Sequence, residues 1–160
     1  MITLRATSDL DLVGALWISL LHHHQRCGQR IGELAAPVAD ETSWAIRRRQ
    51  YESWSAEPGW LLIVAESEGS VCGYAAARVT PSASSWDFGT VVGRLETLVV
   101  AAEARGRGVG AALVDAVRGH WRHFGVTFAS VSVIAGNDAA QRFYERLGAV
   151  EFTRTSYFPV

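Results

Sequence analysis

Three glycines at the junction of two hydrophobic periods constrain this chain more than any other feature. Gly106, Gly108 and Gly110 fall close together, where they would weaken the interior of a strand or a helix. Residues 94–100, before the glycines, are largely apolar and rich in β-branched side chains, as in a buried strand. Residues 109–124, after them, carry apolar side chains at helical spacing. The pattern predicts a strand, a tight glycine loop and a helix.

The predicted loop has the properties of an anion-binding turn. The first backbone N–H groups of a helix have no partner within it, and the helix dipole adds about half a positive charge at that end. Arg105 and Arg107 flank the first glycine, and no carboxylate follows Glu103 in the loop. Because phosphates bind readily at such helix N-termini, the sequence predicts a pyrophosphate-binding turn.

Two familiar phosphate loops fit this turn poorly. A Walker-type loop needs Lys-Ser or Lys-Thr after its last glycine, whereas Ala111 and Ala112 follow Gly110. The dinucleotide pattern G-x-G-x-x-G/A is satisfied by residues 106–111. It expects an acidic ribose ligand about 20 residues further on, and residues 126–135 contain none. A third kind of loop is therefore needed.

Two blocks of the sequence together resemble the GNAT superfamily of N-acetyltransferases. Residues 105–110 match the family's acetyl-CoA signature Q/R-x-x-G-x-G/A, and residues 137–148 match its pattern Asn-x-x-Ala-x-x-Phe-Tyr-x-x-x-Gly. The resemblance implies a single domain over residues 1–160 with the α/β fold of GNAT-like acyl-CoA N-acyltransferases. That fold has a mixed sheet and the element order β-α-α-β-β-β-α-β-α-β. The proline often found after the family's fourth strand is absent here.

The resemblance also implies a function, namely acetyl transfer from acetyl-CoA to a primary amine by direct attack in a ternary complex. A primary amine has a pKa of about 10.4, so it needs a base near neutral pH. Glu96 stands at the family's base position and Tyr144 at its general-acid position. The positions that match the cofactor site are Leu98, Val99, Val100, Arg105, Gly106, Arg107, Gly108, Val109, Gly110, Ala111, Asn137 and Tyr144. In the family, an N–H near Val99 and Val100 also stabilises the oxyanion.

Alternatives stay open for both catalytic candidates and for the activity itself. Glu96 could be a strand glutamate that faces solvent or pairs with Arg94, and Tyr144 could be a core residue with its hydroxyl at the surface. A non-catalytic acyl-CoA-binding regulatory domain would keep the pyrophosphate loop without turnover. The presence of both Glu96 and Tyr144 favours the enzyme.

The amine acceptor is left open between a small molecule and a peptide. Trp86, Asp87 and Phe88 could hold a cationic amine through cation–π contact and an ion pair, or the aromatic rings could cover a core edge. An acidic pocket for a polyamine could be lined by Glu33, Asp40, Glu41 and Asp87. A homodimer is an expectation from the family alone.

Periodicity and turn residues predict the remaining elements. We expect strands at residues 2–6, 60–65, 71–80, 126–135 and 150–158, with both 60–65 and 126–135 buried. Further helices are expected after a capping box of Ser8 and Asp11, at residues 40–55, and at residues 137–147. Residues 28–39 are expected to form a loop. The helix at 40–55 should bury Trp44, Tyr51 and Trp54 and expose arginines 47–49 on a solvated face.

Composition excludes several classes of partner. The net charge is −1, which argues against a general nucleic-acid or anionic-membrane surface. The first residues lack a signal-peptide pattern, and no apolar run is long enough to span a bilayer, so a cytoplasmic location is expected. Cys27 and Cys72 should be free thiols. Zinc binding by histidines 22–24 with Cys27 is disfavoured, because adjacent helical residues point in different directions, and we expect no metal.

Overall fold

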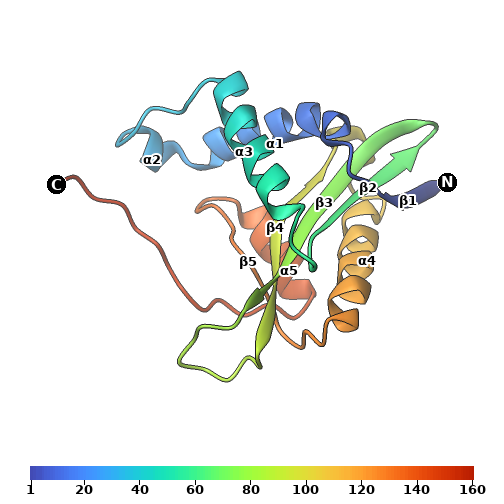
Figure 1. The fold of residues 1–160 in the computed structure, drawn as a ribbon. Coiled ribbons are helices and arrows are strands. Elements are labelled where there is room, and N and C mark those ends of the chain that lie inside the picture. Colours follow the sequence, from blue (N-terminus) through green and yellow to red (C-terminus); the bar gives the residue numbers. More distant parts are fainter.

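The computed structural model describes residues 1–160 and shows a five-stranded mixed sheet with helices on both faces (Figure 1). The strands lie side by side in chain order, as β1 (Ile2–Ala6), β2 (Leu61–Ser67), β3 (Ser70–Pro81), β4 (Val91–Val100) and β5 (Ala129–Val131). The first four are antiparallel, and β5 runs parallel to β4. The mixed α/β fold and the parallel crossover into β5 are therefore confirmed.

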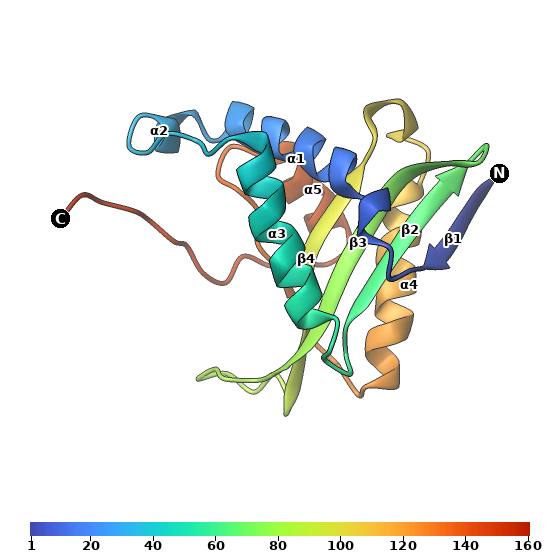
Figure 2. The same cartoon turned by 45° about the horizontal axis from the view of Figure 1, so that its top comes forward.

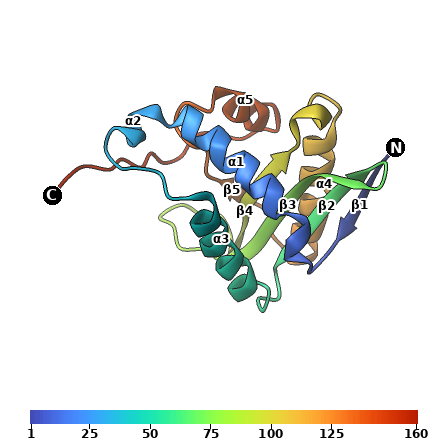
Figure 3. The same cartoon turned by 90° about the horizontal axis from the view of Figure 1, so that it is seen from above.

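The helices divide into two groups on opposite faces of the sheet. They are α1 (Gly14–Cys27), α2 (Gln29–Gly32), α3 (Asp40–Trp54), α4 (Val109–His123) and α5 (Asp138–Arg146). Figure 2 shows α3 on one side of the strands and α4 on the other. Seen from above in Figure 3, α3 and α5 lie on opposite sides of α1. We call the two sides of the sheet the α3 face and the α4 face.

Each face of the sheet has its own apolar core. On the α4 face, Leu113 and Trp121 pack on the strands, and Phe143 of α5 joins them. On the α3 face, Tyr51 packs with Val64 and Tyr74. Trp44 and Trp54 pack against the same core. The expected core role of these three aromatic residues of α3 is thus confirmed.

A β-bulge in β4 changes which face its side chains occupy. Ala76 of β3 pairs with Thr97, and the next residue, Ala77, pairs with Leu95, so Glu96 is an extra residue in β4. Leu95 belongs to the core on the α4 face, whereas Thr97 contacts Tyr51 on the α3 face. Bulges of this kind re-aim side chains near functional sites. Here the bulge falls on the predicted base.

The predicted capping box of Ser8 and Asp11 at the start of the first helix is wrong. Asp9, not Ser8, accepts the N–H of Asp11, at 3.0 Å, and the turn that follows at Leu10–Leu12 is a 3-10 helix. The α-helix begins only at Gly14. A further difference is the short helix α2 within residues 28–39, which were expected to be a loop.

The C-terminal part of the sheet is smaller than predicted. The strand expected at residues 126–135 is only three residues long, and its side chains are exposed or half-buried. The strand expected at 150–158 does not form, and these residues are exposed and lead away from the sheet (Figure 1). Strand-like composition needs a paired edge to take effect, and β5 pairs with β4 alone over three positions. Phe152 instead packs on Phe88, with ring centroids 5.6 Å apart.

Candidate active site

The loop between β4 and α4 has a backbone that only glycine adopts easily. Gly106 has φ of +73° and Gly108, which precedes the first turn of α4, has φ of +81°. A Cβ at either position would meet nothing within 4 Å. The space beside both residues is therefore open, and side chains are excluded by backbone conformation rather than by crowding. Such a cradle fits the close approach of a pyrophosphate.

Donors and positive charge surround this cradle. The N–H of Ala112 bonds to Gly108 O at 3.0 Å as the first helical bond of α4. The N–H groups of residues 109–111 therefore have no helical partner and are available to an anion. The Nε of Arg105 donates to Val100 O at 3.1 Å, which ties the loop to the end of β4. Arg107 is exposed and has no ion pair. The residues present thus fit the adenylyl pyrophosphate of acetyl-CoA.

One edge of β4 is free beside Leu98, Val99 and Val100, three of the predicted cofactor-site residues. The pairing of β4 with β5 ends at Leu95 and Val131, so residues 96–100 have no partner strand on that side. The N–H of Ala101 donates to Cys72 O at 2.8 Å, toward β3. Alternation along the strand then directs the N–H of Val100 away from β3, into the gap beside β4. The N–H of Leu98, two residues earlier, points into the gap by the same alternation.

Glu96 lies on the α3 face within a small group of charges. Its carboxylate is 3.2 Å from Arg78 and 3.7 Å from Arg94. Arg78 also binds Glu57 at 2.8 Å and lies over the ring of Trp54 at 4.4 Å. The pairing with Arg94 that the sequence left open is present. These contacts hold Glu96 on the α3 face, where the free edge of β4 begins.

Tyr144 lies on the α4 face, in α5, and packs against the core there. Burial raises the pKa of Tyr144 to about 12, so its phenol stays protonated throughout the physiological range. The hydroxyl makes no hydrogen bond within the chain, which leaves it able to donate to a ligand. Asn137, at the start of the same helix, accepts the N–H of Ala140 at 3.2 Å and so caps α5. Its amide nitrogen makes no hydrogen bond within the chain and is available to a cofactor.

The histidine-rich end of α1 forms pairs rather than a metal site. His22 contacts Asp40 at 2.9 Å, and the Nε2 of His23 lies 3.6 Å from the Sγ of Cys27. No group of three or more potential ligands is placed to hold a metal ion. Both cysteines are free thiols, as predicted.

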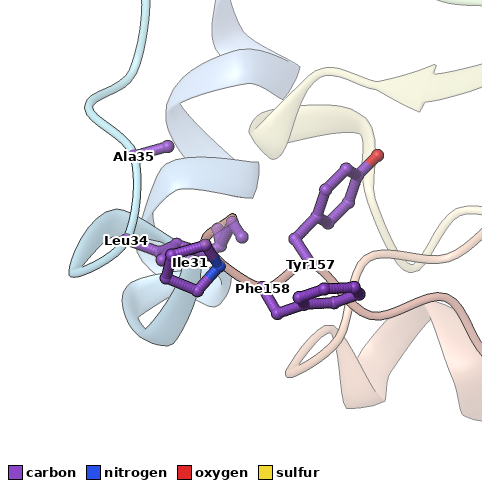
Figure 4. Close-up of a pocket in the computed structure, with 6 residues that line it drawn as sticks. Ile31, Leu34, Ala35, Tyr157 and Phe158 are labelled. Atoms are coloured by element: carbon purple, nitrogen blue, oxygen red, sulfur yellow. The ribbon is translucent and has the colours of Figure 1, made fainter.

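Two further regions lie apart from the predicted catalytic and cofactor-binding residues. A hollow of about 440 Å³ lies between α2 and the C-terminal segment and is lined mainly by Ile31, Leu34, Tyr157 and Phe158 (Figure 4). None of the predicted site residues lines it. In the loop after β3, Asp87 accepts the N–H of Gly89 at 3.0 Å, and Phe88 packs on Phe128 with centroids 5.5 Å apart. Phe88 therefore covers an apolar edge.

Sequence reasoning missed Arg47, which was expected on a solvated face. Its guanidinium lies over Trp17 at 4.5 Å from the ring centroid, and near Tyr51 and Trp54 at 5.7 and 5.8 Å. Residues 47, 51 and 54 stand at i, i+4 and i+7 on α3, so they share one face of the helix. That spacing could have indicated that Arg47 lies on the aromatic face of α3 and not on the solvated face.

A profile of the Acetyltransferase (GNAT) family matches residues 12–149. The chain belongs to the GNAT family. Two similar curated proteins are mycothiol acetyltransferases. The protein from Thermobispora bispora is 33% identical over 71% of this chain and 38% of its own length. The protein from Propionibacterium freudenreichii is 29% identical over 94% of this chain and 43% of its own length. This GNAT chain thus spans about two fifths of these relatives.

Solved structures share the GNAT fold at low sequence identity. A putative acetyl transferase from Pyrococcus furiosus has a TM-score of 0.79 and 17% identity over all of both chains. AAC(6')-Iy, solved in complex with the bisubstrate analog CoA-S-monomethyl-acetylneamine, has a TM-score of 0.69 and 19% identity over 100% of this chain and 98% of that one. The predicted fold is confirmed.

None of the helices is long and apolar enough to cross a membrane.

Proposed function

We propose that this GNAT domain transfers the acetyl group of acetyl-CoA to a primary amine of a small molecule or a peptide, by direct attack in a ternary complex. The observation that carries this proposal is the open glycine cradle at the start of α4, next to the free edge of β4. The cradle suits a pyrophosphate, and the free edge suits an extended arm that leads from it toward Glu96. CoA complexes among the similar folds are consistent with this ligand.

The proposed roles of the residues follow the movement of charge. Glu96 takes a proton from the amine, directly or through a water, so that the nitrogen lone pair can attack the thioester carbon. The N–H of Val100 stabilises the negative charge that develops on the carbonyl oxygen. When the carbon–sulfur bond breaks, the phenol of Tyr144 protonates the leaving thiolate. An N-acetylated amine and free CoA result, and no cysteine nucleophile is used.

The geometry of the two catalytic candidates supports this division of work. Glu96 approaches from the α3 face and Tyr144 from the α4 face, and β4 separates them. With the base and the acid on opposite sides of the free edge, Glu96 can act on the amine nitrogen and Tyr144 on the leaving sulfur. The separation also prevents a direct proton transfer between the two side chains. Asn137 is retained as a cofactor contact through its amide nitrogen.

Calorimetric titration with acetyl-CoA, with NAD as the control ligand, tests the proposal. Thiol release is then measured in the same sample with a panel of primary amines. Saturable acetyl-CoA binding, no NAD binding and thiol release are expected. Binding without release across the panel would favour the regulatory acyl-CoA-binding domain, and absence of acetyl-CoA binding would contradict both functions.

A further inference from the structure

Arg47 differs from the other partly buried arginines in having no acidic partner. Arg48, Arg78 and Arg118 are also partly buried, and each forms an ion pair with at least one carboxylate. No carboxylate of the chain lies within 4.0 Å of the guanidinium of Arg47. A partly desolvated guanidinium usually has an anionic partner. The chain itself does not supply one here.

Aromatic rings hold Arg47 in a defined position. Trp17 of α1 and Tyr51 and Trp54 of α3 surround its guanidinium, and we call these four residues the Arg47 cluster. The Nε of Arg47 is buried and makes no hydrogen bond. Cation–π contacts stabilise the charge but satisfy none of the N–H donors. The terminal nitrogens are therefore the groups left to meet a ligand.

The Arg47 cluster lies on the same face of the sheet as the proposed base. Trp54 is shared, because its ring is 5.8 Å from the guanidinium of Arg47 and 4.4 Å from that of Arg78. Arg78 in turn binds Glu96 at 3.2 Å. Burial raises the pKa of Tyr51, and the charges of Arg47 and Glu96 act on the same hydroxyl in opposite directions. Arg47 and Glu96 thus belong to one electrostatic environment.

The charge of this environment is positive. Glu57 and Glu96 both pair with Arg78, and Glu96 also lies near Arg94, so Arg47 is the unmatched charge of the group. His24 adds no negative charge, and its pKa is lowered by burial, by His23 and by Arg47. Asp40, which the sequence suggested for an acidic pocket, pairs with His22. A polycationic acceptor would be repelled here.

We propose that Arg47 binds a carboxylate of the acceptor, so that the acceptor is an amine that also carries a carboxylate. This inference rests on the proposed transferase function and names its substrate class. Arginine binds carboxylates through two parallel N–H donors, and the stacked guanidinium presents its terminal nitrogens in a fixed plane. Binding the carboxylate at Arg47 directs the amine of the same molecule toward Glu96. Trp54, whose ring lies near both Arg47 and the Arg78 that pairs with Glu96, is the apolar surface for the carbon chain between the two groups.

Matched acceptors test the substrate class. Linear ω-amino acids from glycine to 6-aminohexanoate are compared with their carboxamides in the thiol-release assay, at a pH at which each pair has a similar fraction of free amine. For the best chain length, the carboxylate is expected to have a kcat/KM about tenfold to hundredfold above that of the carboxamide, the range of a charge-assisted hydrogen bond. Equal rates for both forms at every length would overturn the inference and leave the transferase intact.

Variants on α3 test the residue. Arg47→Gln is expected to reduce the preference for the carboxylate to about onefold, through KM rather than kcat, because Arg47 binds and does not react. Arg47→Lys retains the charge but lacks the planar pair of donors, so it should keep part of the preference. Arg49→Gln is the control, since Arg49 is exposed on the same helix and has no ion pair. A full preference in Arg47→Gln would overturn the inference.

A binding measurement separates this inference from the activity. Tryptophan fluorescence is titrated with the carboxylic acid that lacks the amine, because Trp17 and Trp54 adjoin the site. Saturable quenching in the wild type and Arg49→Gln, lost in Arg47→Gln, supports the carboxylate site even if no amine releases thiol. Quenching of equal affinity in all three proteins, or none in the wild type, overturns it. Thiol release with cationic amines alone would also overturn it, while confirming the transferase.

Discussion

The two ends of the candidate site are built in different ways. The cradle of residues 105–111 is one short segment, and it offers backbone N–H groups and left-handed glycines. The α3 face collects its side chains from α1, α3, β3 and β4, and it offers charges and aromatic rings. A site made of local backbone is visible in the sequence. A site made of distant side chains appears only when the chain is folded.

The largest effect is expected at the cradle. Gly108→Val should reduce acetyl-CoA affinity by about 10³-fold, because a β-branched residue resists the φ of +81° and disturbs several charge-assisted N–H contacts. Calorimetric titration measures this. Gly119→Ala, in the middle of α4 with open space around it, is the control and should bind normally. Normal affinity of Gly108→Val would mean that the backbone there does not hold the pyrophosphate.

Tyr144→Phe should lower kcat by roughly 10²-fold or more while acetyl-CoA affinity stays nearly unchanged, because only the proton donor is removed. The pKa of Tyr144 is raised to about 12, so the protonated form is present below that pH and is lost only above it. The wild type should therefore show no loss of this donor at pH 10, where an ordinary tyrosine is half ionised. Tyr157→Phe, at an exposed tyrosine, serves as the control. Equal turnover would remove Tyr144 from the mechanism.

Glu96→Gln should lower turnover by about tenfold to hundredfold at pH 7 and shift the pH profile toward higher pH. Without a base, the rate follows the free amine, which increases up to a pKa of about 10.4. The deficit should therefore shrink as pH increases. A pH–rate series for the wild type and the variant measures it. An unchanged profile would assign deprotonation to solvent or another group, and Glu96 would then be a structural partner of Arg78 and Arg94.

The smallest effect concerns stability on the α3 face. The hydroxyl of Tyr51 lies 2.6 Å from Oγ1 of Thr97 and 3.3 Å from the hydroxyl of Tyr74, and all three residues are buried. Tyr51→Phe should lower the free energy of unfolding by about 1–3 kcal/mol, because buried partners lose a hydrogen bond. Urea unfolding measures it, with Tyr157→Phe as the control. Unchanged stability would show that this face does not depend on its hydroxyl network.

The sequence predicts the fold well where patterns are local and strong. The hairpin of β2 and β3 and the strand, loop and helix around Gly108 follow from periodicity and turn residues, and the structure has them. The sequence predicts the fold poorly where a distant part of the chain determines the local structure. Residues 150–158 have strand-like composition, yet no strand forms beside β5. Ser8 and Asp9 can both cap a helix, and only the path of the chain selects Asp9.

By itself, the sequence determined the cradle, the order of the main elements from β1 to α5, and the positions of Glu96 and Tyr144 in their strand and helix. These depend on contacts between residues near one another in the chain, on glycine's conformational freedom and on apolar periodicity. Only the tertiary structure decided that Glu96 lies in a β-bulge and pairs with Arg78, and that Arg47 lies among aromatic rings without a carboxylate. Those contacts join residues far apart in the chain, and packing of α1 and α3 on the sheet brings them together.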